Sequence, residues 1–168
     1  MALGLKGKVQ ILFVCTGNIC RSPMAEALLK KRLPAKYKSR VNIISAGTHA
    51  IDGYPSSFTG LSVAEELGID LSQHKSQPVT PWLLAHSDLI LVMEPAHLDA
   101  IRRFDPTASP RTFILPEFGF SEDMRDGNSE VFDPISGDLS VYQRVYHELD
   151  REITRIIPFI EQVIESAG

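Results

Sequence analysis

The sequence is poor in cysteine and has no long hydrophobic run. Its 168 residues include only two cysteines, Cys15 and Cys20, which lie too close together to staple a fold. The apolar run from Val9 to Val14 is far shorter than the roughly 20 residues that span a bilayer, and no small-residue cleavage site follows it. We therefore expect a cytoplasmic protein that does not insert into a membrane and keeps both cysteines as thiols.

The sequence also lacks an excess of positive charge and any pattern of metal ligands. Its formal net charge is −4, which gives no general attraction to nucleic acid or to an anionic membrane. The five histidines are scattered, and the two cysteines have no second pair with which to form a zinc site. We expect no metal, no other cofactor and no nucleic-acid partner, while the oligomeric state is not predicted.

Strand and helix patterns alternate along the chain and predict one α/β domain over residues 1–168. Short apolar runs indicate strands, and apolar residues spaced by threes and fours indicate helices. The predicted strands are Val9–Val14, Val41–Ala46, Asp88–Met93 and Thr112–Leu115, and the predicted helices are Arg21–Leu33, Ser57–Leu67, Pro95–Phe104 and Leu139–Ile164, the last kinked at Pro158. This order is typical of a parallel sheet covered by helices on both faces, with ligands bound at the carboxyl ends of the strands.

The loop between the first predicted strand and the first predicted helix has the features of an anion site. Its backbone N–H groups can form a concavity for an anion, and the helix N-terminus adds its positive dipole end. Gly17 and Asn18 tolerate the positive φ that a tight loop needs. The guanidinium of Arg21 can bind phosphate oxygens bidentately. The expected phosphate-binding residues are Thr16, Gly17, Asn18, Ile19, Cys20, Arg21 and Ser22.

Cys15, at the start of this loop, is the candidate nucleophile. A helix N-terminus and a nearby cation favour the thiolate form of a cysteine, which is the form that attacks phosphorus. Ser22 could donate a hydrogen bond to that sulfur. The alternative is a buried structural cysteine with Arg21 in solvent. The combination of glycine, asparagine, arginine and serine in a strand-loop-helix setting favours the catalytic interpretation.

The segment Cys-Thr-Gly-Asn-Ile-Cys-Arg-Ser-Pro-Met-Ala-Glu at residues 15–26 resembles the phosphate loop of the low-molecular-weight protein tyrosine phosphatases. The resemblance continues in order over essentially the whole chain, through Ser45–Thr48, Gly68–Asp70 with His74, Ile90–Met93 and Asp133-Pro134. It implies four parallel strands in the order 2-1-3-4. It also implies hydrolysis of phosphotyrosine-containing proteins or small aryl phosphates through a cysteinyl-phosphate intermediate.

The resemblance assigns the general acid to Asp133, which would protonate the leaving oxygen and later activate water. The dipeptide alone does not select it, because Asp105-Pro106 is an equally good pair and Asp-Pro often starts a turn. Ile135 and Ser136 follow Asp133-Pro134, where many family members have aromatic residues, so phosphotyrosine selectivity stays open.

Asn18, Ser45 and His74 match residues that support the phosphate loop by hydrogen bonding in this family. Cys20 is the expected redox partner of Cys15, because a neighbouring thiol can capture an oxidised nucleophile as a disulfide.

Three alternatives remain. In the related protein-arginine phosphatases a threonine tends to stand where this chain has Ile19, so the isoleucine favours tyrosine. Arsenate reductases that relay thiols use further cysteines, and this chain has two. The third alternative is a non-catalytic phosphate-binding or redox-sensing module, against which Cys15, Arg21 and Asp133 together argue.

Overall fold

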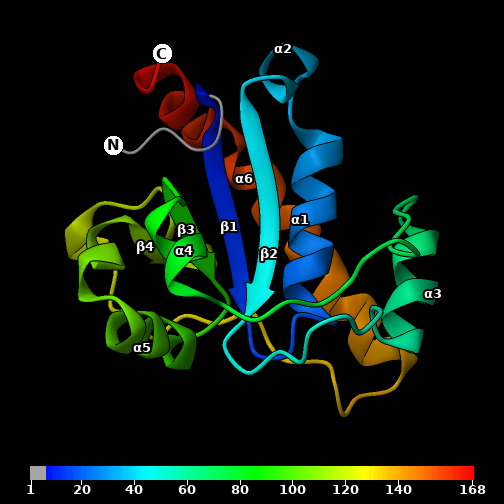
Figure 1. Cartoon of the computed structure of the whole chain (residues 1–168). Helices are drawn as coiled ribbons and strands as arrows, with labels where there is room; N and C mark the ends of the chain where they lie inside the picture. The colour runs from blue at the N-terminus through cyan, green and yellow to red at the C-terminus, as the bar shows by residue number, and fades with distance from the viewer. Residues whose placement is uncertain (1–6) are drawn as a thin grey trace.

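A four-stranded parallel sheet forms the centre of the protein (Figure 1). The computed structural model describes residues 7–168. The strands are β1 (Val9–Cys15), β2 (Val41–Gly47), β3 (Leu89–Val92) and β4 (Thr112–Ile114), in the order β2-β1-β3-β4. Every pairing between neighbouring strands is parallel. The predicted α/β class and strand order are confirmed.

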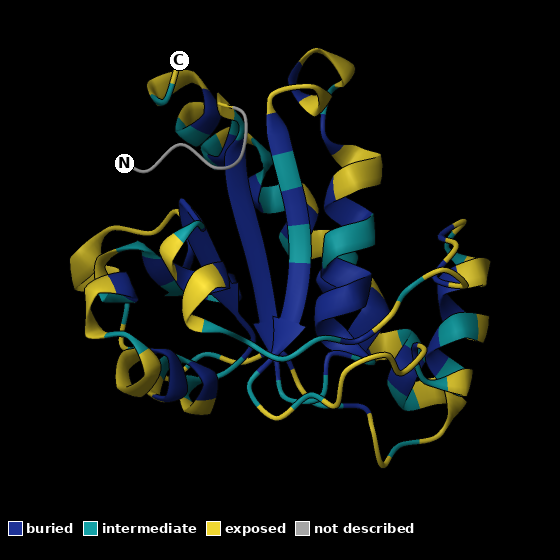
Figure 2. Ribbon diagram, viewed as in Figure 1, coloured by how far each residue is buried: buried dark blue, intermediate teal, exposed yellow. Residues whose placement is uncertain are grey.

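Helices cover both faces of this sheet. They are α1 (Arg21–Arg32), α2 (Ala35–Lys38), α3 (Phe58–Glu66), α4 (Pro81–Ala85), α5 (Pro95–Phe104) and α6 (Leu139–Ser166), with short 3-10 turns at Pro106–Arg111, Leu115–Glu117 and Glu122–Met124. The side chains of β1 alternate between two cores, because successive residues of a strand point to opposite faces. Ile11 and Phe13 pack with α1 and α6, while Leu12 and Val14 pack with α4 and α5. Figure 2 shows β1 buried along its whole length.

The structure differs from the predicted elements mainly in its shortest helices. The single turns α2 and α4 were not predicted, since four or five residues are too few to show a helical period. Helix α6 is one continuous element through Pro158, and the kink stays a prediction. The extent of the domain over residues 1–168 also stays a prediction, because residues 1–6 lie outside the described part. Between residues 7 and 168, no helix is both long and apolar enough to cross a membrane.

The carboxyl ends of β1 and β2 meet at the same edge of the sheet, where the loop after β1 turns into α1 (Figure 1). Gly47 ends β2 and packs directly against this loop. A Cβ atom at Gly47 would lie 2.4 Å from the carbonyl oxygen of Thr16 and 3.0 Å from the amide nitrogen of Asn18. Only a residue without a side chain allows this close approach.

Candidate active site

The loop from Thr16 to Cys20 has the backbone geometry of an anion cradle. Asn18 has a φ of 56°, the only positive φ of a non-glycine residue between residues 7 and 168. Gly17, in contrast, does not use the positive φ that it was expected to allow. Within the described chain, the N–H groups of residues 16–20 donate to no backbone carbonyl. Because α1 begins at Arg21, its first N–H groups face the same loop.

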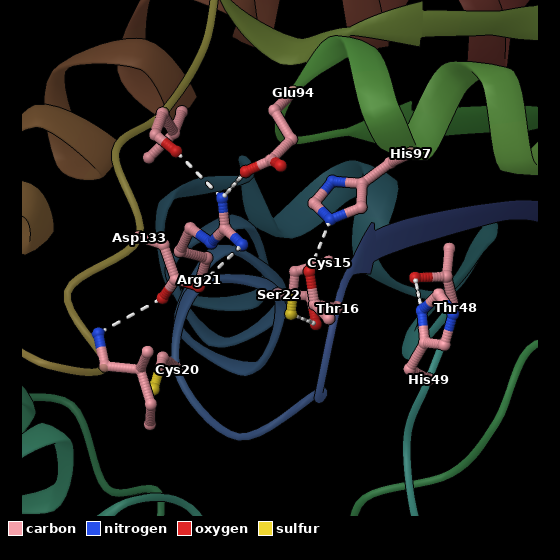
Figure 3. A network of polar contacts seen from close by, with 12 residues as sticks. Cys15, Thr16, Cys20, Arg21, Ser22, Thr48, His49, Glu94, His97 and Asp133 are labelled. Atoms are coloured by element: carbon pink, nitrogen blue, oxygen red, sulfur yellow. Dashed lines mark hydrogen bonds and ion pairs between the residues drawn. The ribbon is translucent and has the colours of Figure 1, made fainter.

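Cys15 lines a small pocket, and Figure 3 shows it beside Ser22 and Thr16. Its side chain is buried, and Sγ lies 2.9 Å from Oγ of Ser22. The pocket has a volume of about 170 Å³ and is lined by Cys15, Thr16, Gly17, Ile19, Cys20, Arg21, Asp133 and Ile135. Three larger cavities, of about 710, 510 and 230 Å³, lie elsewhere and contain none of these side chains. The three residues that the sequence indicated for catalysis, Cys15, Arg21 and Asp133, therefore line the smaller pocket.

Arg21 is held from behind by two acceptors. Its side chain is buried, with Nη1 2.6 Å from Oε2 of Glu94 and 3.0 Å from the carbonyl oxygen of Val131. Nη2 lies 3.3 Å from Oδ2 of Asp133. Nε is buried and has no hydrogen-bond partner in residues 7–168. Since a buried donor without a partner is costly, this nitrogen fits an anion bound in the pocket.

Of the two Asp-Pro pairs, only Asp133-Pro134 contributes to the pocket. The side chain of Asp133 is 38% exposed, and its Oδ1 accepts a hydrogen bond from the amide of Ile135 at 3.1 Å. Asp105 instead caps the 3-10 turn that follows α5, where its Oδ1 accepts from the amide of Thr107. Hydrogen bonds from Thr107 also lower the pKa of Asp105. Asp133 thus lines the same pocket as Cys15 and Arg21.

Asn18 is fixed by hydrogen bonds from every side. Its Nδ2 donates to the hydroxyl oxygens of Ser22 and Ser45, at 2.8 and 2.9 Å. Its Oδ1 accepts from the amide of Gln77, and its carbonyl oxygen accepts from Nε2 of His74 at 2.7 Å. These bonds hold the positive φ of Asn18, and they bring together all the supporting residues that the sequence indicated.

Cys20 is anchored to the last helix. Its Sγ lies 3.3 Å from the hydroxyl of Tyr142 and 3.6 Å from that of Ser57, and its carbonyl oxygen accepts from the hydroxyl of Tyr146. Burial raises the pKa of the Cys20 thiol. Burial likewise raises the pKa of Tyr142, to about 12. Both tyrosines lie on the buried side of α6, so their hydroxyl groups reach the loop from the core.

Sequence reasoning missed Glu94 and His97. Glu94 lies two residues beyond β3, at the N-cap of α5, and an acid near the carboxyl end of a buried strand is a sequence signal for this position. His97 is buried in the first turn of α5, and its Nε2 lies 2.8 Å from Oγ1 of Thr16. No local sequence signal distinguished this histidine from the other four.

The chain belongs to the low-molecular-weight phosphatase family. Residues 10–166 match the family described as "Low molecular weight phosphotyrosine protein phosphatase". The family prediction is confirmed, and the protein is a cysteine-dependent phosphatase of this fold.

Proteins named as tyrosine phosphatases and proteins named as arginine phosphatases are both similar to this chain. "Probable low molecular weight protein-tyrosine-phosphatase EpsP" of Ralstonia nicotianae is 36% identical over 150 residues, which cover 89% of this chain and 94% of that protein. The solved "YwlE arginine phosphatase from Geobacillus stearothermophilus" is 34% identical with a TM-score of 0.79, covering 92% of this chain and 94% of that one. The tyrosine phosphatase Wzb from Escherichia coli K30, solved with sulphate, is 32% identical with a TM-score of 0.78, covering 90% and 97%.

Proposed function

We propose that this protein hydrolyses phosphotyrosine in proteins, and small aryl phosphates, through a phosphoryl-cysteine intermediate at Cys15. The observation that carries the proposal is one pocket lined by Cys15, Arg21 and most of the loop between them. Among residues 7–168, Nε of Arg21 has no hydrogen-bond partner and the N–H groups of residues 16–20 have no backbone acceptor. Oriented donors of this kind stabilise the charge of a transferring phosphoryl group.

In the first step, Sγ of Cys15 attacks phosphorus while the bond to the ester oxygen breaks. The loop amides and Arg21 hold the phosphoryl oxygens, and Asp133 protonates the departing oxygen. A bound phosphoryl group competes with Asp133 for Nη2 of Arg21, which lies 3.3 Å from the carboxylate. Binding of substrate therefore releases Asp133 from its ion pair, so that the carboxylate can take up a proton from solvent and donate it to the leaving oxygen.

In the second step, water attacks phosphorus, Asp133 takes its proton, and the bond between sulfur and phosphorus breaks. The thiolate of Cys15 leaves next to the hydroxyl of Ser22, which is 2.9 Å away and can donate to it. Asn18, Ser45 and His74 act by holding the loop in its binding conformation. Arg21 and the loop amides supply the positive charge that a metal ion supplies in other phosphatases.

The pocket walls favour an aryl phosphate. Ile19 and Ile135 line it with aliphatic surface, which suits the faces of an aromatic ring. A phosphoguanidinium group calls for additional acceptors, and Asp133 is the only carboxylate among the lining residues of this pocket. The names of relatives such as EpsP support the same substrate.

The test is a steady-state comparison of phosphotyrosine, phosphoserine and phosphoarginine peptides, with Cys15→Ser as the inactive control. We expect kcat/KM to be highest for phosphotyrosine and turnover to be lost in Cys15→Ser, which keeps the fold but lacks the acidic thiol. A higher kcat/KM for phosphoarginine would overturn the substrate assignment. Turnover that survives in Cys15→Ser would overturn the mechanism.

We further propose that the protein acts in the cytoplasm, without metal, nucleic-acid or membrane partners, and that Cys20 protects the nucleophile. Peroxide converts the Cys15 thiolate to a sulfenic acid, and the Cys20 thiol then displaces water to form a disulfide. Both thiols are free in the structure.

A further inference from the structure

His97 is a buried polar side chain that the proposed reaction does not use. It lies in the first turn of α5, with 2% of its surface exposed, and faces the residue that follows the nucleophile (Figure 3). Its Nε2 lies 2.8 Å from Oγ1 of Thr16. Its Nδ1 is buried without a hydrogen-bond partner among residues 7–168. A histidine in such a place has one polar contact, and that contact is with the phosphate loop.

The surroundings of His97 determine which nitrogen carries its proton. A buried N–H group without a partner is rarer than a buried acceptor without one, so the proton belongs on Nε2, where Thr16 Oγ1 accepts it. The charged and titratable groups near the ring are Arg21 on α1, Glu94 before α5, Asp133 before α6 and His49 after β2. Burial and the charge of Arg21 lower the pKa of His97 to about 4, which keeps the ring neutral.

Thr16 is held at two points as a result. Its carbonyl oxygen accepts from the amide of His49 at 2.9 Å, and its side chain accepts from His97. Thr16 also lines the pocket beside Cys15 and Arg21. Its N–H group is one of the unpaired donors of the loop, so the orientation of this residue sets the direction of a phosphate-binding amide.

We propose that His97 is a positioning residue of the phosphate loop, which donates Nε2–H to Oγ1 of Thr16 and so keeps the amide of Thr16 directed at the bound phosphoryl group. The proposal rests on the proposed function in one respect, that the phosphoryl group binds in this pocket. His97 itself touches neither substrate nor nucleophile, and its effect passes through Thr16 alone.

The test is a double-mutant cycle read by phosphate binding. His97→Phe keeps a flat ring but removes the donor, His97→Gln restores an amide donor, and Thr16→Val removes the acceptor at constant shape. For His97→Phe we expect the inhibition constant of inorganic phosphate, and KM for p-nitrophenyl phosphate, to rise about fivefold, as expected for the loss of one hydrogen bond. The value of kcat should change less, and His97→Gln should recover most of the loss.

Thr16→Val should show a similar loss, and adding His97→Phe to it should cost nothing more. Wild-type phosphate binding in His97→Phe, or losses that add in the double variant, would overturn the proposal. Thr16→Val keeps the test valid if His97→Phe fails to fold. Inhibition by inorganic phosphate does not depend on which phosphate compound is the natural substrate. The double-mutant cycle therefore tests His97 even if the proposed substrate is wrong.

A second measurement needs no substitution. In histidine labelled with ¹⁵N, the chemical shifts of the His97 ring distinguish a protonated from an unprotonated nitrogen. We expect Nε2 to carry the proton and Nδ1 to be bare at neutral pH, with or without inorganic phosphate. A proton on Nδ1 would make Thr16 the donor and would overturn the assignment.

Discussion

Arg21 contacts two carboxylates in the structure, and we assign a different role to each. Glu94 lies 2.6 Å from Nη1 and holds the buried guanidinium in place. Asp133 lies 3.3 Å from Nη2, and its side chain lines the pocket and is 38% exposed. A buried cation needs at least one permanent partner, and Glu94 provides it. Asp133 is therefore free to exchange its ion pair for proton transfer when a phosphoryl group binds.

This division predicts the effect of Asp133→Ala. A poor leaving group needs protonation more than an activated one, so kcat/KM, which leaves out hydrolysis of the cysteinyl phosphate, should fall about 10²- to 10⁴-fold for phenyl phosphate and much less for p-nitrophenyl phosphate. The matched control is Asp105→Ala, since Asp105 caps a distant 3-10 turn. That control should keep wild-type kcat/KM for both substrates. Equal losses on the two substrates in Asp133→Ala would argue against a general-acid role.

Cys20 gives a second prediction at the residue scale. The hydrogen bonds of its thiol to Tyr142 and Ser57 must break before a disulfide with Cys15 can form. We expect peroxide to inactivate the wild type reversibly, with activity returning after a dithiol, while Cys20→Ser is oxidised further and recovers poorly. Inorganic phosphate should slow inactivation by occupying the loop. Equal recovery of both proteins would show that Cys20 has no protective role.

At the scale of elements, the site depends on how closely β2 approaches the loop after β1. A Cβ atom at position 47 would stand 2.4 Å from the carbonyl oxygen of Thr16 and 2.8 Å from Cβ of Ala50. We expect Gly47→Ala to displace the loop, lower kcat/KM for p-nitrophenyl phosphate at least tenfold, and destabilise the fold by about 1–3 kcal/mol. Ala50→Gly in the same background should not restore activity, because the backbone clash with Thr16 remains. Restored activity would place the decisive contact at Ala50 instead.

Helix α6 supports the same loop from the other side. Tyr142 and Tyr146 are four residues apart, so they lie on one face of the helix. Both face the core, and their hydroxyl groups reach Cys20. A helical spacing of this kind indicates burial, but a buried tyrosine also needs a partner for its hydroxyl, and no sequence pattern says which element supplies it.

The sequence predicted the strands and helices with a clear hydrophobic period, and the phosphate loop, whose residues are contiguous. The long strands and helices have clear periods, and the phosphate loop is a continuous motif, so both could be read directly. Contacts such as Arg21 with Glu94 and Thr16 with His97 join residues 73 and 81 positions apart. Such pairs follow from the packing of α5 against the loop, which a single sequence does not contain.

At the scale of the whole molecule, the fold places a neutral buried histidine, His97, near charged groups, and this affects stability in acid. An unfolded chain protonates His97 near its ordinary pKa of 6.5, whereas burial and Arg21 hold the pKa in the folded protein at about 4. Because the unfolded state binds the proton first, His97 reduces the free energy of unfolding as the pH falls from 6.5 towards 4.

The loss should reach about 3 kcal/mol at the acid end of this range. Urea unfolding of the wild type and His97→Gln at pH 7 and pH 4.5 measures it, and carboxylates that also titrate affect both proteins alike. We expect the wild type to lose more stability than His97→Gln between the two pH values, since glutamine takes up no proton. An equal loss in both proteins would mean that the folded state accommodates a charged His97, with Glu94 and Asp133 offsetting the repulsion from Arg21.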